Sequence, residues 1–460
     1  MIGLPPFLSF SENERTLQLK TLMIILRTVK NISSLNIAAS VLLFLAAILA
    51  AVVANSSLSP VYQDFLLQEL HLRIGNFNLF SHGGHPLKMI EFINDCLMTV
   101  FFLAVGLEIK RELLVGELSS VRKAALPFIA ACGGMVIPVV IYALSVASGT
   151  PETRGMAIPM ATDIAFSLGV LSLLGKRVPL SLKIFLTAFA VVDDIGGILV
   201  IALFYSADVA YGYLIAAAVL YVFLYYMGKF GVTQKIFFLF FGVIIWYLFL
   251  QSGIHSTISG VILAFVIPAR PRLDAGKYIE RIRDIIGEFP VSKSDNIVLT
   301  NAQIATLKQV ERASDYVISP LQSLEDNLHG AVSFVILPLF AFANAGVVFS
   351  GSGSIVGDVS IAVAAGLLLG KFLGIYLFTW LAVKSGVALM PAGMNWKNIA
   401  GVSLLGGIGF TVSLFIANLS FADEYPELLN QAKFGVLVGT VLAGVLGYVV
   451  LNWVLPKREK

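Results

Sequence analysis

Long apolar segments follow one another along almost the whole chain. A helix needs roughly 20 apolar residues to cross the hydrocarbon core of a bilayer, and twelve such segments can be read in the sequence. They lie at about 35–55, 89–107, 124–147, 156–175, 181–206, 209–228, 234–251, 253–268, 329–350, 359–383, 398–419 and 434–455. With 58% apolar and only 13% charged residues, the chain must be solvated by lipid. We therefore expect an all-α polytopic membrane protein with about twelve transmembrane helices.

Basic residues are distributed unevenly among the loops between these segments. Alternate loops contain nearly all of the 31 Lys and Arg residues. The other side of the membrane has only Arg73, Lys88, Arg154 and Lys433. Since cytoplasmic loops are enriched in Lys and Arg, we predict a multi-pass protein of the cell inner membrane with both termini cytoplasmic. The net charge of +3 reflects these loops, so we infer no nucleic-acid partner.

The parts outside the spans are short, with one exception. The N-terminal tail, 1–34, is mixed polar and charged and does not form a cleavable signal peptide. One membrane domain is expected at 35–455, interrupted by a long cytoplasmic loop insertion at 269–328 and followed by a cytoplasmic tail at 456–460. Cys96 and Cys132 both lie in apolar stretches, so neither a disulfide framework nor a structural metal site is expected.

Ionisable residues occur inside the predicted spans, although each costs at least ~2.5 to 3.5 kcal/mol at the bilayer centre. Away from the span ends, Lys371 is the only Lys or Arg, and the acids are Asp95, Asp163, Asp193 and Asp194. Asp163 and Asp193 each lie about 12 residues from the turn at 175–181, or about 18 Å from the cytoplasmic end of their helices. Lys371 lies about 20 Å from the cytoplasmic end by the same measure. Three carboxylates and one ammonium group are thus predicted near the midplane.

The neighbours Asp193 and Asp194 must point in different directions, because successive residues on a helix are rotated by about 100°. We predict that Asp193 faces Lys371, and that Asp194, with the hydroxyl of Thr162, faces a water-filled cavity and binds a cation. Hard oxygen ligands suit a small alkali ion. Two carboxylates in a low-dielectric site cannot easily both stay ionised, so sodium ions and protons would compete for the same oxygens. Purely structural ion pairs are the alternative, but three acids with one base leave unbalanced charge.

Two of the spans contain helix-breaking residues at the same depth. Gly155 and Pro159 precede Asp163, and the eleventh span carries Gly406, Gly407 and Gly409. Interrupted helices at the midplane are typical of transporter ion sites, and the charge of Asp163 could balance the positive helix ends that face it. For the Gly-Gly-Ile-Gly stretch alone, a close contact between helices is the favoured interpretation.

Several motifs in these spans resemble the NhaA family of sodium/proton antiporters. They include Ala161-Thr162-Asp163-Ile164-Ala165-Phe166, Val192-Asp193-Asp194-Ile195-Gly196, Gly106-Leu107-Glu108-Ile109-Lys110-Arg111-Glu112-Leu113, Pro338-Leu339-Phe340-Ala341-Phe342-Ala343-Asn344-Ala345-Gly346-Val347, Gly370-Lys371 and Gly406-Gly407-Ile408-Gly409-Phe410-Thr411. The resemblance extends from about 35 to 455. It implies inverted repeats with two broken helices that cross near the midplane. The implied activity is electrogenic exchange of sodium or lithium ions for protons, for pH and salt homeostasis, with no cofactor and no enzymatic reaction.

The resemblance also implies roles for single residues. Asp193 and Asp194 would bind the ion and protons beside Thr162, Asp163 would balance charge at the crossed helices, and Lys371 would pair with Asp193. A cytoplasmic pH-responsive cluster maps onto Glu108, Glu112, Glu325 and His329, and a further pH-responsive position onto His255. A solvated helix face is the alternative for Glu108 and Glu112, and a structural role is the alternative for His255.

Some positions depart from the pattern of this family. Phe372 follows Lys371 where proline is usual, and Asp326 and Gly330 flank His329 where histidine and proline are expected. These departures leave the predicted ion site intact. Two other functions remain open at this stage, a sodium-coupled solute symporter and an intramembrane aspartyl protease. Both a monomer and a homodimer in the bilayer are compatible with the sequence.

Overall fold

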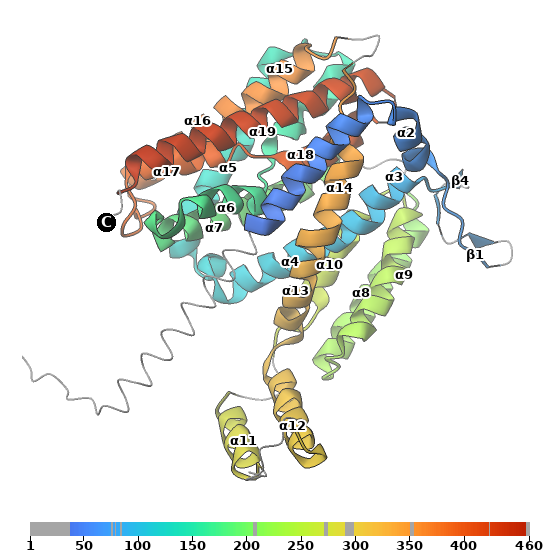
Figure 1. Ribbon diagram of the computed structural model, residues 1–460, viewed down its shortest axis with the longest axis vertical. Coiled ribbons are helices and arrows are strands. Elements are labelled where there is room, and N and C mark those ends of the chain that lie inside the picture. Colours follow the sequence, from blue (N-terminus) through green and yellow to red (C-terminus); the bar gives the residue numbers. More distant parts are fainter. Residues whose placement is uncertain are drawn as a thin grey trace, which may run out of the picture.

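The computed structural model is a bundle of helices (Figure 1). It describes residues 37–456 except for 75–76, 79, 83–84, 206–208, 271–274, 290–298, 350–353 and 423. The predicted N-terminal tail at 1–34 and nearly all of the predicted C-terminal tail lie outside the described residues.

Within the described residues, eight helices are long and apolar enough to cross a membrane. They are Ile37–Ala54; α3 (Met89–Phe92), η1 (Ile93–Leu97) and α4 (Met98–Val115) as one helix; α5 (Val121–Ser145); α7 (Leu180–Phe204); α8 (Tyr211–Lys229); α13 (Pro320–Ala331), η5 (Val332–Ile336) and α14 (Leu337–Asn344) as one helix; α15 (Asp358–Ala365), η6 (Gly366–Gly370) and α16 (Lys371–Lys384) as one helix; and α19 (Pro426–Val454). Two further spans are bent: η3 (Pro151–Met160) with α6 (Ile164–Leu173) by 46°, and α17 (Trp396–Leu405) with α18 (Phe410–Phe421) by 44°. The apolar helices α9 (Lys235–Leu250) and α10 (Thr257–Val266) are shorter.

Each of the twelve predicted segments corresponds to one of these helices or bent pairs, so the prediction of an all-α polytopic membrane protein is confirmed. The ninth span begins earlier than predicted, at Pro320 rather than 329. Local signals explain this start: Ser319 accepts a hydrogen bond from the backbone N–H of Gln322, and proline occupies the first helical position. The eighth span is shorter than predicted and begins at Thr257.

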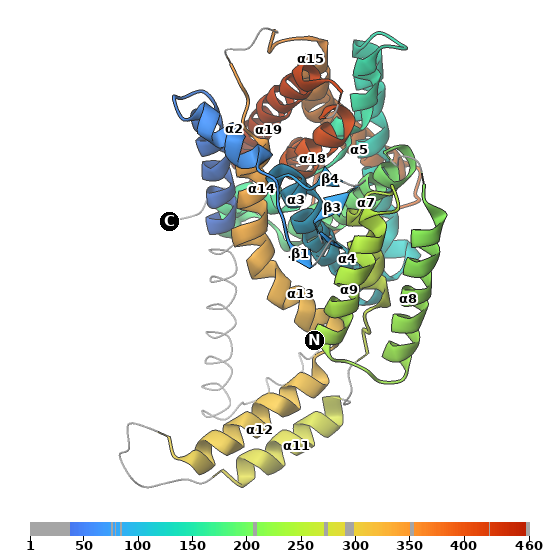
Figure 2. The ribbon, with the colours of Figure 1, turned by 90° about the vertical axis from the view of Figure 1, so that its right-hand side faces the viewer.

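Smaller elements lie around the bundle. In the long loop, α11 (Ala275–Gly287) and α12 (Asn301–Val317) form a helical hairpin that projects from one end of the molecule (Figures 1 and 2). Towards the other end lies α2 (Ser59–Leu67). Between α2 and α3, two short antiparallel hairpins pair β1 (Arg73–Ile74) with β2 (Phe77–Asn78) and β3 (Ser81–His82) with β4 (His85–Pro86). Single helical turns connect other spans at η2 (Glu117–Ser119) and η4 (Gly175–Arg177).

The two bent spans are held together where their helices break. The backbone N–H of Asp163 donates to the carbonyl oxygen of Ile408 at 2.6 Å, and Ser167 Oγ donates to the carbonyl oxygen of Leu405 at 3.0 Å. On the other side of the breaks, Ser413 Oγ donates to the carbonyl oxygen of Ile158 at 2.7 Å. Unpaired backbone groups are costly in a membrane interior. Each bent span therefore supplies hydrogen-bond partners for backbone groups that the break in the other span leaves without a helical partner.

We expect Gly407→Ala to destabilise this crossing strongly. A Cβ atom at Gly407 would lie 2.3 Å from the carbonyl oxygen of Leu367, and a backbone atom in a packed span cannot move aside cheaply. The thermal unfolding midpoint of the purified variant should fall well below that of the wild type. Gly197→Ala in α7 is the control, because no atom lies within 4 Å of its added Cβ. Equal midpoints for the two variants would contradict the assigned packing.

Close packing of α5 against α16 determines where Lys371 lies. A Cβ at Gly374 would lie 2.1 Å from the carbonyl oxygen of Gly133, and a Cβ at Gly133 would lie 2.3 Å from that of Gly374. Glycines that allow two backbones to approach this closely are characteristic of membrane helix contacts. Lys371 precedes Gly374 by about one helical turn, so this contact fixes the lysine in the bundle interior.

Candidate ion-binding site

Asp193 of α7 and Lys371 of α16 form a buried ion pair. Lys371 Nζ donates to Asp193 Oδ2 at 2.5 Å, and both side chains are fully buried. The predicted contact between these two residues is therefore present. The other carboxylate oxygen, Asp193 Oδ1, accepts no hydrogen bond from any of the described residues. Such an oxygen can serve a further ligand only if that ligand brings positive charge or a proton.

Asp194 follows on the same helix and faces a different environment. It is 5% exposed, and its Oδ1 also lacks a hydrogen-bond partner within the described part of the chain. It lines a cavity of ≈ 290 Å³ together with Thr162, as was predicted for both residues. Thr162 Oγ1 donates its proton to the carbonyl oxygen of Gly406 at 2.8 Å. The hydroxyl therefore retains only its lone pairs for another partner, which suits a cation.

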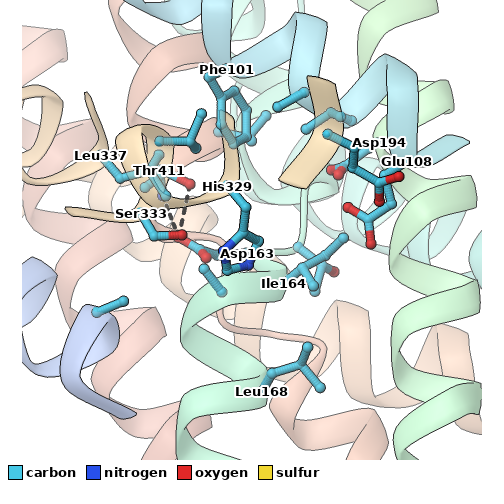
Figure 3. Close-up of a pocket in the computed structure, with 18 of the residues that line it drawn as sticks. Phe101, Glu108, Asp163, Ile164, Leu168, Asp194, His329, Ser333, Leu337 and Thr411 are labelled. Atoms are coloured by element: carbon cyan, nitrogen blue, oxygen red, sulfur yellow. Dashed lines mark hydrogen bonds between the residues drawn. The ribbon is translucent and has the colours of Figure 1, made fainter. Parts of the chain in front are cut away.

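The cavity connects the helix breaks with the ends of α4 and α13. Its lining includes Asp163 and Asp194 beside the breaks, and Glu108, Glu325 and His329 from α4 and α13. Figure 3 shows Asp194 and Glu108 on one side of this space and Asp163 with Thr411 on another. Acidic side chains from α4, α7, α13 and the break before α6 thus line one cavity.

Asp163 lies between the N-termini of two half-helices. Its Oδ1 accepts from the backbone N–H of Phe166, in the first turn of α6, at 2.9 Å. Its Oδ2 accepts from the backbone N–H and the hydroxyl of Thr411, in the first turn of α18, at 3.2 and 2.8 Å. Each helix N-terminus carries about half a positive charge. One carboxylate therefore lies between two converging helix N-termini and is bonded to both. The charge-balancing role of Asp163 stays a prediction.

Thr411 was not identified as a functional residue from the sequence, although it is the second residue of α18, directly after the break at 406–409. We expect Thr411→Val to lower the free energy of unfolding by about 1.5–3 kcal/mol, the usual net value of a hydrogen bond to a charged group. The measurement is thermal or denaturant unfolding in a fixed detergent. Thr379→Val is the matched control, because the buried hydroxyl of Thr379 makes no hydrogen bond to the described residues. If both variants lose the same stability, the bond to Asp163 contributes nothing specific.

Arg111 connects acidic residues of α4 and α13. Its guanidinium lies 2.9 Å from Glu325, 3.3 Å from Glu112 and 4.0 Å from Glu108. Glu112 is buried and accepts a hydrogen bond from the backbone N–H of Glu117 at 3.0 Å, and it does not line the cavity. The structure therefore brings Glu108, Glu112 and Glu325 together, with Arg111 as a partner that was not predicted. The position of Arg111 between Glu108 and Glu112 on one helix was the sequence feature that could have predicted this partner.

The two candidate pH-responsive histidines lie in different surroundings. His329 lines the cavity. His255 Nε2 lies 3.6 Å from Asp95 Oδ1, and its ring packs edge-on against Phe415 with centroids 5.2 Å apart. The pH-responsive roles of both histidines stay predictions.

Apolar and amide side chains fill the bundle around Phe415 of α18. Its ring centroid lies 5.7 Å from that of Phe102 and 6.4 Å from that of Phe340. Asn418, one turn further along, donates to Asn344 Oδ1 at 2.9 Å, and Asn344 also exchanges hydrogen bonds with Asn94. Phe415 and Asn418 lie on the same helix as Thr411, but neither they nor the side chains packed around them line the cavity.

Buried carboxylates with unpartnered oxygens, two helices broken at one level and a cavity that leads to the breaks together define an ion transporter of the membrane. The chain belongs to the family described as Na+/H+ antiporter 1, whose model matches residues 30–451. It is 75% identical over 437 residues to the Na(+)/H(+) antiporter NhaA of Bacteroides fragilis, a match that covers 95% of this chain and 100% of that protein. It is 74% identical over 438 residues to the protein of the same name from Bacteroides thetaiotaomicron, with 95% and 100% covered. For that of Parabacteroides distasonis, the identity is 50% over 448 residues, with 96% and 99% covered. The predicted family membership is confirmed, and these relatives are named as transporters rather than enzymes.

Proposed function

We propose that this protein exchanges sodium ions for protons across the cell inner membrane, and that Asp194 and Asp193 bind both. The observation that carries the proposal is the buried carboxylate of Asp194, which has an unpartnered oxygen and lines the cavity at the helix breaks. Membership in the antiporter family supports the same function.

Competition at these oxygens provides the exchange mechanism. Neighbouring carboxylates in a low-dielectric site favour a state in which protons or a cation neutralise them. A dehydrated sodium ion would take oxygen ligands from Asp194, Asp193 and Thr162, and protons would leave as it binds. When sodium draws the Asp193 carboxylate away from Lys371, the lysine can also lose its proton. More protons than sodium ions would then move per cycle, which makes the exchange electrogenic. Lithium, with the same charge and the same preference for oxygen, would be a second substrate.

Alternating access would operate through the two broken spans. By the distribution of basic loops, the cavity mouth at Glu108 and Glu325 faces the cytoplasm, so the protein is inward-open in this conformation. The packed side chains around Phe415 would close the opposite side. Because Asp163 bridges the first turns of α6 and α18, movement of one broken span would be transmitted to the other.

The two other functions considered for this chain do not fit the site. An aspartyl protease needs two carboxylates that share a proton across a scissile bond, whereas Asp193 is engaged by Lys371 and Asp194 is turned about 100° from it. A solute symporter needs a pocket for its organic substrate, but the cavity of ≈ 290 Å³ is at the lower limit for small-molecule sites. Neither function is supported by the comparisons with known proteins.

The test uses everted membrane vesicles from a strain that lacks its own sodium/proton antiporters. With a respiration-driven pH gradient followed by a dye, sodium or lithium should collapse the gradient only when the protein is present. Potassium should have no effect, and no organic solute should be needed. A sodium response that requires an added solute, or no response to sodium and lithium across pH 6 to 9, would contradict the proposal.

A further inference from the structure

A second cavity, apolar and larger than the first, lies on the flank of the bundle. It has a volume of ≈ 610 Å³ and is formed mainly by three helices, the first helix (Ile37–Ala54), α6 and α19, with Phe410 of α18. Its walls include Phe44, Leu173 and Val445, whose side chains are 42%, 58% and 55% exposed. All three helices lie within predicted spans, so the medium that fills this groove is the hydrocarbon of the membrane.

We propose that this groove binds one acyl chain of an anionic phospholipid whose headgroup lies at the cytoplasmic end of α6. The groove follows the first helix from Ile37 to Ala51, a rise of about 21 Å. One leaflet contributes about half of the roughly 30 Å hydrocarbon core. The groove is therefore long enough for a single chain that enters from the cytoplasmic leaflet.

Positive charge at one end of the groove indicates where the headgroup lies and that it is anionic. The groove ends at Leu173 and Tyr448, and Lys176 and Arg177 follow Leu173 within about one turn. Arg177 donates hydrogen bonds to Asn452 and to backbone carbonyl oxygens at the end of α19, and it has no carboxylate partner within the described chain. Lys176 is exposed, and no ion pair among the described residues includes it. Within the described chain, Lys176 has no acidic partner and Arg177 has only neutral oxygens as partners, so this end of the groove is positively charged and attracts anionic lipid. A tyrosine at this level suits the interface.

The groove also touches the crossing of the broken helices. Phe166 and Phe410 form part of its wall; the backbone N–H of Phe166 donates to Asp163, and Phe410 precedes Thr411. Ser40 Oγ, on the first helix, donates to the carbonyl oxygen of Ala165 at 2.9 Å. An acyl chain in the groove would thus pack on the outer side of the breaks that carry the ion site on their inner side. We expect the bound lipid to stabilise this crossing.

Lipid retention by the purified full-length protein tests the proposal. Phosphatidylglycerol and phosphatidylcholine of identical chain length are titrated separately in detergent, and bound lipid is counted by native mass spectrometry. The wild type should bind one phosphatidylglycerol tightly and phosphatidylcholine at least about fivefold more weakly, as expected for removal of a favourable charge interaction. Equal binding of the two lipids would overturn the anionic assignment.

Two pairs of variants locate the lipid. Val445→Trp fills the groove and should abolish tight binding, whereas Val449→Trp, one turn along α19 and 54% exposed but outside the groove, should not. If Val445→Trp unfolds, Val441→Trp is a second variant that fills the same groove. Lys176→Gln should weaken phosphatidylglycerol binding about fivefold, and Lys123→Gln, an exposed residue at the start of α5, should leave it unchanged. If the groove variants bind phosphatidylglycerol as the wild type does, the proposal is wrong. The groove then does not hold the acyl chain of a lipid whose headgroup lies at Lys176 and Arg177.

Discussion

Replacement of Asp194 by asparagine is expected to reduce sodium-triggered proton movement to the level of membranes without the protein. Asparagine keeps the shape of the side chain but can neither carry the negative charge that holds a cation nor bind and release a proton. Lys371 engages Asp193, whereas Asp194 forms no ion pair with the described residues and its Oδ1 has no hydrogen-bond partner among them. The measurement is the collapse of a pH gradient in everted vesicles at equal protein abundance.

Asp358→Asn is the matched control for this variant. Asp358 is an exposed acid at the start of α15, outside the cavity, so its replacement should leave transport within about twofold of the wild type. Sodium-dependent proton movement that survives in Asp194→Asn at more than a tenth of the wild-type rate would place the exchange at another group.

Replacement of Lys371 by methionine is expected to cause the largest loss of stability. Methionine has a similar length but no charge, so the Asp193 carboxylate would remain buried without its partner. Breaking a buried ion pair in this way typically costs about 3–5 kcal/mol. Unfolding of the purified variant in mixed micelles should show this loss at a pH where Asp193 would otherwise be ionised.

The double variant Lys371→Met/Asp193→Asn separates the ion pair from simple packing. When both charges are removed, no uncompensated charge is left, and most of the lost stability should return. If the double variant is as unstable as Lys371→Met alone, the lysine stabilises the bundle by its packing rather than by its charge.

The number of spans could be predicted because apolar length is a local property of the sequence. The start of the ninth span was missed for the same reason. The second turn of α13 carries Glu325 and Asp326, and hydropathy does not detect a helix where charged residues extend it beyond the hydrocarbon. Caps such as Ser319 mark such starts better than hydropathy does.

The ion site could be predicted in part, because the depth of a residue in the membrane and its direction around the helix follow from counting residues. Those two quantities placed Asp193 opposite Lys371 and turned Asp194 away from it. The bonds from Thr411 to Asp163 and from Arg111 to Glu325 depend on how helices far apart in the sequence cross, so counting along the chain could not reveal them. The apolar groove could not be predicted for the same reason, since residues of four separate spans form its walls.

The central claim is that sodium ions and protons compete for the same buried oxygens. Its most direct test is proton release on addition of sodium chloride to the purified protein in weakly buffered detergent solution, with choline chloride as the reference salt. We predict that sodium and lithium release protons from the wild type and that Asp194→Asn releases none. Sodium binding to the wild type without any release of protons would contradict the account.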